Sequence, residues 1–103
     1  MRRVVITGMG IYSCIGKNLD EVRDSLYNGK SGIVYDASRK ELGFRSALTG
    51  KIEIPDLKEY LSRSQRVYMP EQAKYAYWAT RDALAQAGID QDYLNTHDTG
   101  ILY

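Results

Sequence analysis

The 103-residue chain has only one cysteine and one histidine, and this shortage excludes several kinds of protein. One cysteine cannot form an internal disulfide, and one cysteine with one histidine cannot complete a four-ligand zinc site. The chain also lacks an excess of one charge, because 14 Lys and Arg residues stand against 13 Asp and Glu residues, for a net charge of +1. We therefore expect no nucleic-acid partner and no attraction to an anionic membrane surface.

Long hydrophobic runs are absent from the sequence as well. The apolar residues occur in short stretches, none of them near the ~18 residues needed to cross a bilayer. The opening residues reach Thr7 and Gly8 too early for a signal peptide. We expect a cytoplasmic protein, and the 44% hydrophobic content suits one small domain.

A strand is predicted at the start of the chain. Val4, Val5 and Ile6 form a β-branched run typical of a strand buried on both faces, and Gly8 and Gly10 are expected to turn the backbone after it. This pattern indicates the first strand of an α/β sheet.

Two helices are predicted, and the second gives the strongest local signal. The first follows the N-cap candidate Asn18 and ends at Asn28-Gly29. The second opens at Pro70 and ends at Gly88. Its small residues, which would let another backbone approach closely, are Ala73, Ala76, Ala83 and Ala87. We expect this long helix to be central and packed.

The remaining segments are less regular. Residues 30–42 predict a loop with one short helical turn, and residues 48–54 predict a half-exposed strand or extended arm. A short helix over residues 56–61 and a helical turn over residues 90–95 are predicted next. Residues 99–103 indicate a strand, and because a complete domain seldom ends inside an apolar strand, we expect a piece of something longer.

Few side chains are candidates for chemistry. Gly8 and Gly10 after a strand are compatible with a dinucleotide site, but the third glycine of that motif is replaced by Ser13, which favours a structural turn over nucleotide binding. Cys14 has no base beside it in the sequence, so a small buried filler is the favoured interpretation. His97 lies in a polar stretch typical of a solvated loop. We predict no catalytic residue, no metal and no cofactor among these residues.

One basic cluster is a candidate for binding. Arg63 and Arg66, with Lys58 nearby, would present a small positive patch to an acidic partner. Glu59 and Glu71 dilute this charge, so a solvated mixed face is the alternative.

A family resemblance covers nearly the whole chain. The run Arg3-Val4-Val5-Ile6-Thr7-Gly8-Met9-Gly10-Ile11-Tyr12-Ser13-Cys14-Ile15-Gly16 resembles the opening of the β-ketoacyl-acyl-carrier-protein synthases, the condensing enzymes of fatty acid and polyketide synthesis. Later parts of the chain resemble the same family in the same order: Gly29-Lys30-Ser31-Gly32-Ile33, Phe44-Arg45-Ser46, Met69 before the long helix, and Ala87-Gly88-Ile89 at its end. The spacing is most similar to the type I, chain-elongating synthases.

This resemblance implies a fold and an activity. The fold would be the N-terminal part of a thiolase-like layered α/β/α/β/α architecture, in an enzyme that forms a homodimer, with residues 1–103 an incomplete N-terminal segment of it. The reaction would be an acyl transfer in fatty acid biosynthesis: a cysteine receives an acyl group from acyl carrier protein, and two histidines assist the decarboxylation of a malonyl thioester, without a metal or cofactor. In the family these three residues come after the segment that matches this chain. Cys14 and His97 therefore inherit no catalytic role, and the chain alone is expected to be inactive.

The resemblance also implies where the partner would dock. Family members carry basic residues just before the methionine that opens the long helix, and these residues meet the acidic carrier protein. Arg63 matches this pattern, Ser64 stands where a lysine is common, and Arg66 falls one position away from the usual arginine. We expect weakened carrier docking through Arg63 and Arg66. The alternative for the whole chain is a free-standing, non-catalytic module that binds a partner or self-associates.

Overall fold

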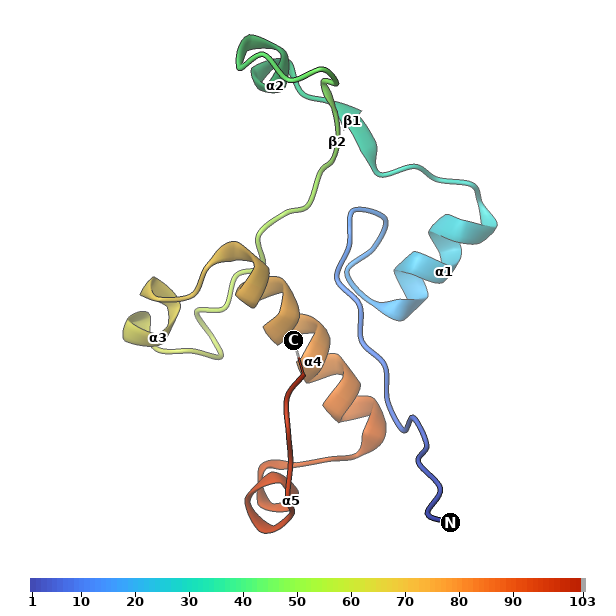
Figure 1. Cartoon of the computed structure of the whole chain (residues 1–103), viewed down its shortest axis with the longest axis vertical. Helices are drawn as coiled ribbons and strands as arrows, with labels where there is room; N and C mark the ends of the chain where they lie inside the picture. Colours follow the sequence, from blue (N-terminus) through green and yellow to red (C-terminus); the bar gives the residue numbers. More distant parts are fainter. Residues whose placement is uncertain (103) are drawn as a thin grey trace.

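The computed structural model describes residues 1–102, in which helices are combined with a small antiparallel sheet (Figure 1). The elements follow the order α1 (Leu19–Tyr27), β1 (Ile33–Tyr35), α2 (Ala37–Glu41), β2 (Leu48–Gly50), α3 (Arg63–Val67), α4 (Glu71–Ala87) and α5 (Gln91–Thr96). This mixture of helix and sheet is consistent with the expected α/β class.

Helix α1 confirms the first predicted helix and its N-cap. The side-chain oxygen of Asn18 accepts a hydrogen bond from the backbone N–H of Glu21 at 2.9 Å. Gly29 follows the helix with a φ of 63°, a left-handed conformation that costs glycine little. On its inner side, the hydroxyl of Ser25 donates to the carbonyl of Ile15 at 2.6 Å, which fastens α1 to the preceding turn.

Helix α4 confirms the long predicted helix at both ends. It has 17 residues, it follows Pro70 in an extended conformation, and it ends at Gly88 with a φ of 70°. The backbone N–H of Gly88 donates to the carbonyls of Leu84 and Ala85, which satisfies groups left free at the helix end.

Two residues of the predicted alanine stripe, Ala83 and Ala87, pack with Ala79 against the N-terminal segment, which runs alongside α4 in Figure 1. A β-carbon at Gly10 would overlap the carbonyl of Ala79, and one at Gly8 would lie 3.0 Å from the β-carbon of Ala87. The predicted close approach is therefore real, and its partner is the backbone of residues 8–10.

The strand predicted over residues 4–6 is wrong, because these residues have no regular structure. A strand is defined by hydrogen bonds to a neighbouring strand, and no described segment supplies them here. The side chains of Val4 and Ile6 are 95% and 85% exposed as a result. Residues 99–102 are also irregular, so the strand predicted at the end is wrong over that range, and Tyr103 lies outside the described residues.

The tight turn comes later than predicted. Gly8 and Gly10 do not turn the backbone; the turn forms over residues 13–16, where the N–H of Ser13 donates to the carbonyl of Gly16 at 2.8 Å. The two earlier glycines are explained by their packing on α4 instead.

Strands β1 and β2 pair as an antiparallel hairpin that carries α2 away from α4 (Figure 1). Ile33 pairs with Gly50, and Tyr35 pairs with Leu48. Helix α2 confirms the predicted helical turn, whereas β1 was missed within the predicted loop. Strand β2 confirms the start of the predicted extended arm.

The helix predicted over residues 56–61 forms only a turn, and α3 follows it instead. The reason is a capping box, in which Ser62 and Gln65 satisfy each other's backbone N–H groups at the start of α3. Helix α5 confirms the helical turn predicted near residues 90–95, with Asp90 as its N-cap.

The core of the described residues is small. Val22 and Leu57 are the buried hydrophobic residues, at 9% and 2% exposed, and no residue of α4 is buried. The long helix is thus half-covered rather than fully packed. The chain exposes 8867 Å², whereas a folded monomer of this mass exposes about 5,900 Å².

Candidate partner-binding surface

Three cations from two helices line one open pocket. Arg63 and Arg66 come from α3, Lys74 comes from the first turn and a half of α4, and Val67 and Met69 complete the lining. The pocket has a volume of about 450 Å³. We call this set of five residues the basic pocket. It brings together the two predicted docking residues, Arg63 and Arg66.

The capping box of α3 fixes the position of both arginines. The N–H of Ser62 donates to the side-chain oxygen of Gln65 at 3.0 Å, and the N–H of Gln65 donates to the hydroxyl of Ser62 at 3.3 Å. Residues three apart on a helix lie on the same face, so Arg63 and Arg66 share one side of α3.

Arg66 is held more firmly than Arg63. Its Nε–H donates to the carbonyl of Leu61 at 3.2 Å, and the residue is half-buried, whereas Arg63 is exposed. This contact gives the Arg66 guanidinium a defined orientation at the edge of the basic pocket.

None of the three cations forms an ion pair with an acid in residues 1–102. The ion pairs there lie elsewhere: Lys17–Glu53, Arg23–Asp20, Arg23–Asp24, Arg39–Asp36 and Lys58–Asp56. Lys58, which the sequence placed near the patch, contacts Asp56 at 4.0 Å and does not line the basic pocket. The three cations of the basic pocket are therefore not compensated by an ion pair within residues 1–102.

Lys74 was missed by the sequence analysis. No local signal indicated it, because a lysine three residues after Glu71 on the same helix is equally explained by a favourable i, i+3 charge arrangement. The position of α3 was also missed, and without α3 the proximity of Lys74 to the arginines could not be seen.

Cys14 lies at the tip of the turn over residues 13–16 and is half-buried. Gly32 and Gly50 both leave room for it: a β-carbon at these positions would lie 2.7 Å and 3.2 Å from its sulfur. Packing between two glycines supports the filler interpretation, although burial is partial.

An exposed ion pair that the sequence analysis missed lies beside this turn. The Nζ of Lys17 is 2.7 Å from a carboxylate oxygen of Glu53. The hydrogen bond between them holds the pKa of Glu53 below its ordinary value and raises the pKa of Lys17. The neighbouring Tyr12 hydroxyl donates to the Glu53 carbonyl at 2.6 Å, and burial raises the pKa of Tyr12.

His97 is exposed at the end of α5, as the loop interpretation predicts. Its Nδ1 lies 3.1 Å from the carbonyl of Tyr93, and its ring stacks on the Tyr93 ring with centroids 3.9 Å apart. Both contacts are local to α5. Across residues 1–102, no group of three His, Cys, Asp or Glu side chains could hold a metal ion, and no helix is long and apolar enough to cross a membrane.

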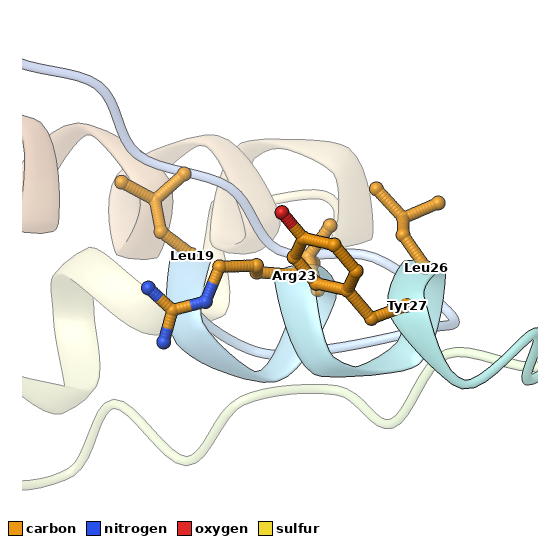
Figure 2. Close-up of a pocket in the computed structure, with 5 residues that line it drawn as sticks. Leu19, Arg23, Leu26 and Tyr27 are labelled. Atoms are coloured by element: carbon orange, nitrogen blue, oxygen red, sulfur yellow. The ribbon is translucent and has the colours of Figure 1, made fainter.

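An apolar surface lies on α1, away from the basic pocket. Leu19, Val22, Arg23, Leu26 and Tyr27 line an open hollow of about 510 Å³, and Figure 2 shows four of these side chains projecting from the helix. Two of them, Leu26 and Tyr27, are 68% and 86% exposed.

The structure is that of a protein that combines helices with a small antiparallel sheet, consistent with the α/β class, and places three cations around one pocket. The family described as "Beta-ketoacyl synthase, N-terminal domain" matches residues 1–103, and the chain belongs to this family. The expected family resemblance is confirmed.

Similar proteins agree with this membership. The chain is 44% identical to the 3-oxoacyl-[acyl-carrier-protein] synthase 1 of Buchnera aphidicola from Acyrthosiphon pisum, over 90% of this chain and 23% of that protein. It is 40% identical to the synthase of the same name from Haemophilus influenzae and 36% identical to that from Escherichia coli K12, in each case over 99% of this chain and 25% of the relative. The chain thus spans about a quarter of the length of these relatives.

Proposed function

We propose that residues 1–103 form the N-terminal segment of a 3-oxoacyl-[acyl-carrier-protein] synthase in fatty acid biosynthesis. The complete enzyme would condense an acyl thioester with malonyl-acyl carrier protein by decarboxylative Claisen condensation. The observation that carries this proposal is the continuous similarity to synthases of this name over 90% to 99% of the chain.

The chain would not perform this reaction by itself. A cysteine nucleophile needs a base or a positive environment to supply its thiolate. In residues 1–102, Cys14 has no hydrogen-bonding base, and His97 makes its contacts within α5. The nucleophile and the two histidines would come from later parts of the enzyme, and the reaction would need an oxyanion hole and imidazoles rather than a metal or a cofactor.

The large exposed surface supports a place within a bigger, layered molecule. The chain exposes 8867 Å², about 3,000 Å² more than expected for its mass. A standard protein interface covers only about 800 Å² on each partner. Further layers of a thiolase-like α/β/α/β/α fold, in a cytoplasmic homodimer, would account for this excess better than a single contact with a second copy.

The contribution of this segment to function would be carrier docking. Arg63 and Arg66 lie together on α3 without an ion pair to any acid in residues 1–102, which suits an acidic carrier protein. Ser64, in place of the usual lysine, leaves α3 with two docking cations.

An activity comparison tests the proposal. The polypeptide encoded by the complete reading frame and the isolated 103-residue chain are each given malonyl-acyl carrier protein and an acyl-acyl carrier protein, and decarboxylation and condensation are measured. We expect turnover by the complete polypeptide and none by the isolated chain. Turnover by the isolated chain would overturn the proposal, and a reading frame that ends at Tyr103 would favour the free-standing module.

A further inference from the structure

The basic pocket contains a cation that the family resemblance does not assign. Lys74 lies on α4, a different helix from Arg63 and Arg66, yet it lines the same pocket. It is half-buried, so part of its side chain is covered while the residue still borders the pocket.

The other cation of α4 is already engaged within the protein. The guanidinium carbon of Arg81 lies 3.8 Å from the ring centroid of Tyr60 and 5.4 Å from that of Trp78. Lys74 has no comparable partner in residues 1–102: it forms no ion pair and no side-chain hydrogen bond there, although Glu71 lies one turn earlier. The charge of Lys74 is therefore not compensated by an ion pair within residues 1–102.

The pocket combines this charge with apolar surface. Val67 is 68% exposed, and it lines the pocket together with Met69 and the three cations. Protein interfaces commonly combine apolar area with charged and polar groups. The partner that fits is a protein face that carries both carboxylates and apolar side chains.

We propose that Lys74 is a further carrier-docking residue, which adds a third positive charge to the basic pocket and contacts an acidic face of the acyl carrier protein. This inference rests on the proposed function. Lys74 would restore from α4 the charge that Ser64 does not supply on α3. A nucleic acid is a poorer candidate, because a net charge of +1 gives no extended basic surface.

Charge reversal in the complete synthase tests this role. The dissociation constant for acyl carrier protein without an acyl group, which binds but cannot transfer, is measured by calorimetry for the wild type, Lys74→Glu, Lys74→Arg and Arg63→Glu, with Lys30→Glu as an exposed control outside the pocket. We expect Lys74→Glu to weaken binding about fivefold to tenfold at low salt, and less at high salt. Lys74→Arg and Lys30→Glu should bind as the wild type does.

A kinetic readout separates docking from folding. Lys74→Glu should raise KM for the carrier-bound substrate and leave the rate with a small thioester that lacks the carrier unchanged, because only carrier contact is lost. If circular dichroism shows that Lys74→Glu is unfolded, Lys74→Gln replaces it, since it removes the charge without adding an opposite one. Unchanged binding in the folded Lys74 variant, with weakened binding in Arg63→Glu, overturns the role of Lys74 alone. Unchanged binding in both, or no carrier binding by the wild type, overturns the proposed docking surface as a whole.

Discussion

Gly10 lies so close to the backbone of Ala79 that a β-carbon at position 10 would overlap the Ala79 carbonyl oxygen. The same β-carbon would lie 3.0 Å from the backbone nitrogen of Ala83, one turn further along α4. The obstacle is helix backbone, which cannot move aside as a flexible side chain would. This contact sets the distance between the N-terminal segment and the longest helix.

We therefore expect Gly10→Ala to be strongly destabilising. The added methyl group would force the segment away from α4, at a cost of about 1–3 kcal/mol or more in the free energy of unfolding. Urea unfolding of the complete synthase measures this change. Gly100→Ala is the matched control, because no atom of residues 1–102 lies within 4 Å of a β-carbon at that position. Equal stability of the two variants would show that the segment does not pack on α4 in this way.

The N-cap of α1 gives a second prediction. Asn18→Ala removes the acceptor for the N–H of Glu21 and should cost about 1 kcal/mol of stability. Asn18→Asp keeps an acceptor oxygen and adds a negative charge at the helix start, so it should be close to the wild type. Thermal unfolding compares the three proteins. An Asp variant as unstable as the Ala variant would argue against a capping role.

The Lys17–Glu53 pair gives a prediction about pH. The pKa of Glu53 is held below its ordinary value of 4.5 by the Lys17 hydrogen bond, so the pair stabilises the folded state above that value. This stabilisation is lost as the pH falls through the lowered pKa of Glu53. At the other end, the pKa of Lys17 is raised, so the contribution is lost as the pH rises above the ordinary lysine value of 10.5 and through the raised pKa.

An NMR titration of the Glu53 carboxyl group measures this effect. In Lys17→Met, the pKa of Glu53 should move upward toward its ordinary value, because both the hydrogen bond and the positive charge are gone. Since both side chains are exposed, about 0.15 M salt should reduce the shift in the wild type. A pKa of Glu53 that is the same in both proteins would show that the pair does not form in solution.

Arg66 gives a prediction that separates orientation from charge. Its Nε–H donates to the carbonyl of Leu61, a contact that a lysine at this position could not reproduce in the same geometry. Arg66→Lys keeps the positive charge, yet it should weaken carrier binding by the complete synthase about twofold to fivefold, because the cation is no longer held in place. Arg63→Lys, at an exposed position without such a contact, should bind as the wild type does. If Arg66→Lys binds the carrier as tightly as Arg63→Lys does, the positive charge of Arg66, and not its orientation, accounts for its contribution to carrier binding.

Local signals explain which elements could be predicted. Asn18 and Gly88 act through their own side chain or backbone conformation, so α1 and α4 could be bounded from the sequence. The capping box of Ser62 and Gln65 is also a local sequence pattern that predicts a helix start. It indicates α3, rather than the helix predicted over residues 56–61.

Long-range contacts explain the rest. Strand β1 has three residues and exists because β2 pairs with it from further along the chain, which no local pattern indicates. Residues 4–6 have strong strand propensity but no pairing partner among the described residues. Propensity alone therefore led to the wrong prediction of a strand there. Lys74 joined the candidate site only when α3 and α4 were placed together.

If this chain is the N-terminal segment of a synthase, the nucleophile lies elsewhere in the enzyme. Mapping the acyl group tests this central claim most directly: the complete polypeptide is loaded from acyl-acyl carrier protein, digested, and its acylated peptide is identified by mass spectrometry. We expect an acyl group on a cysteine beyond Tyr103 and an unmodified Cys14. An acyl group on Cys14 would contradict the claim.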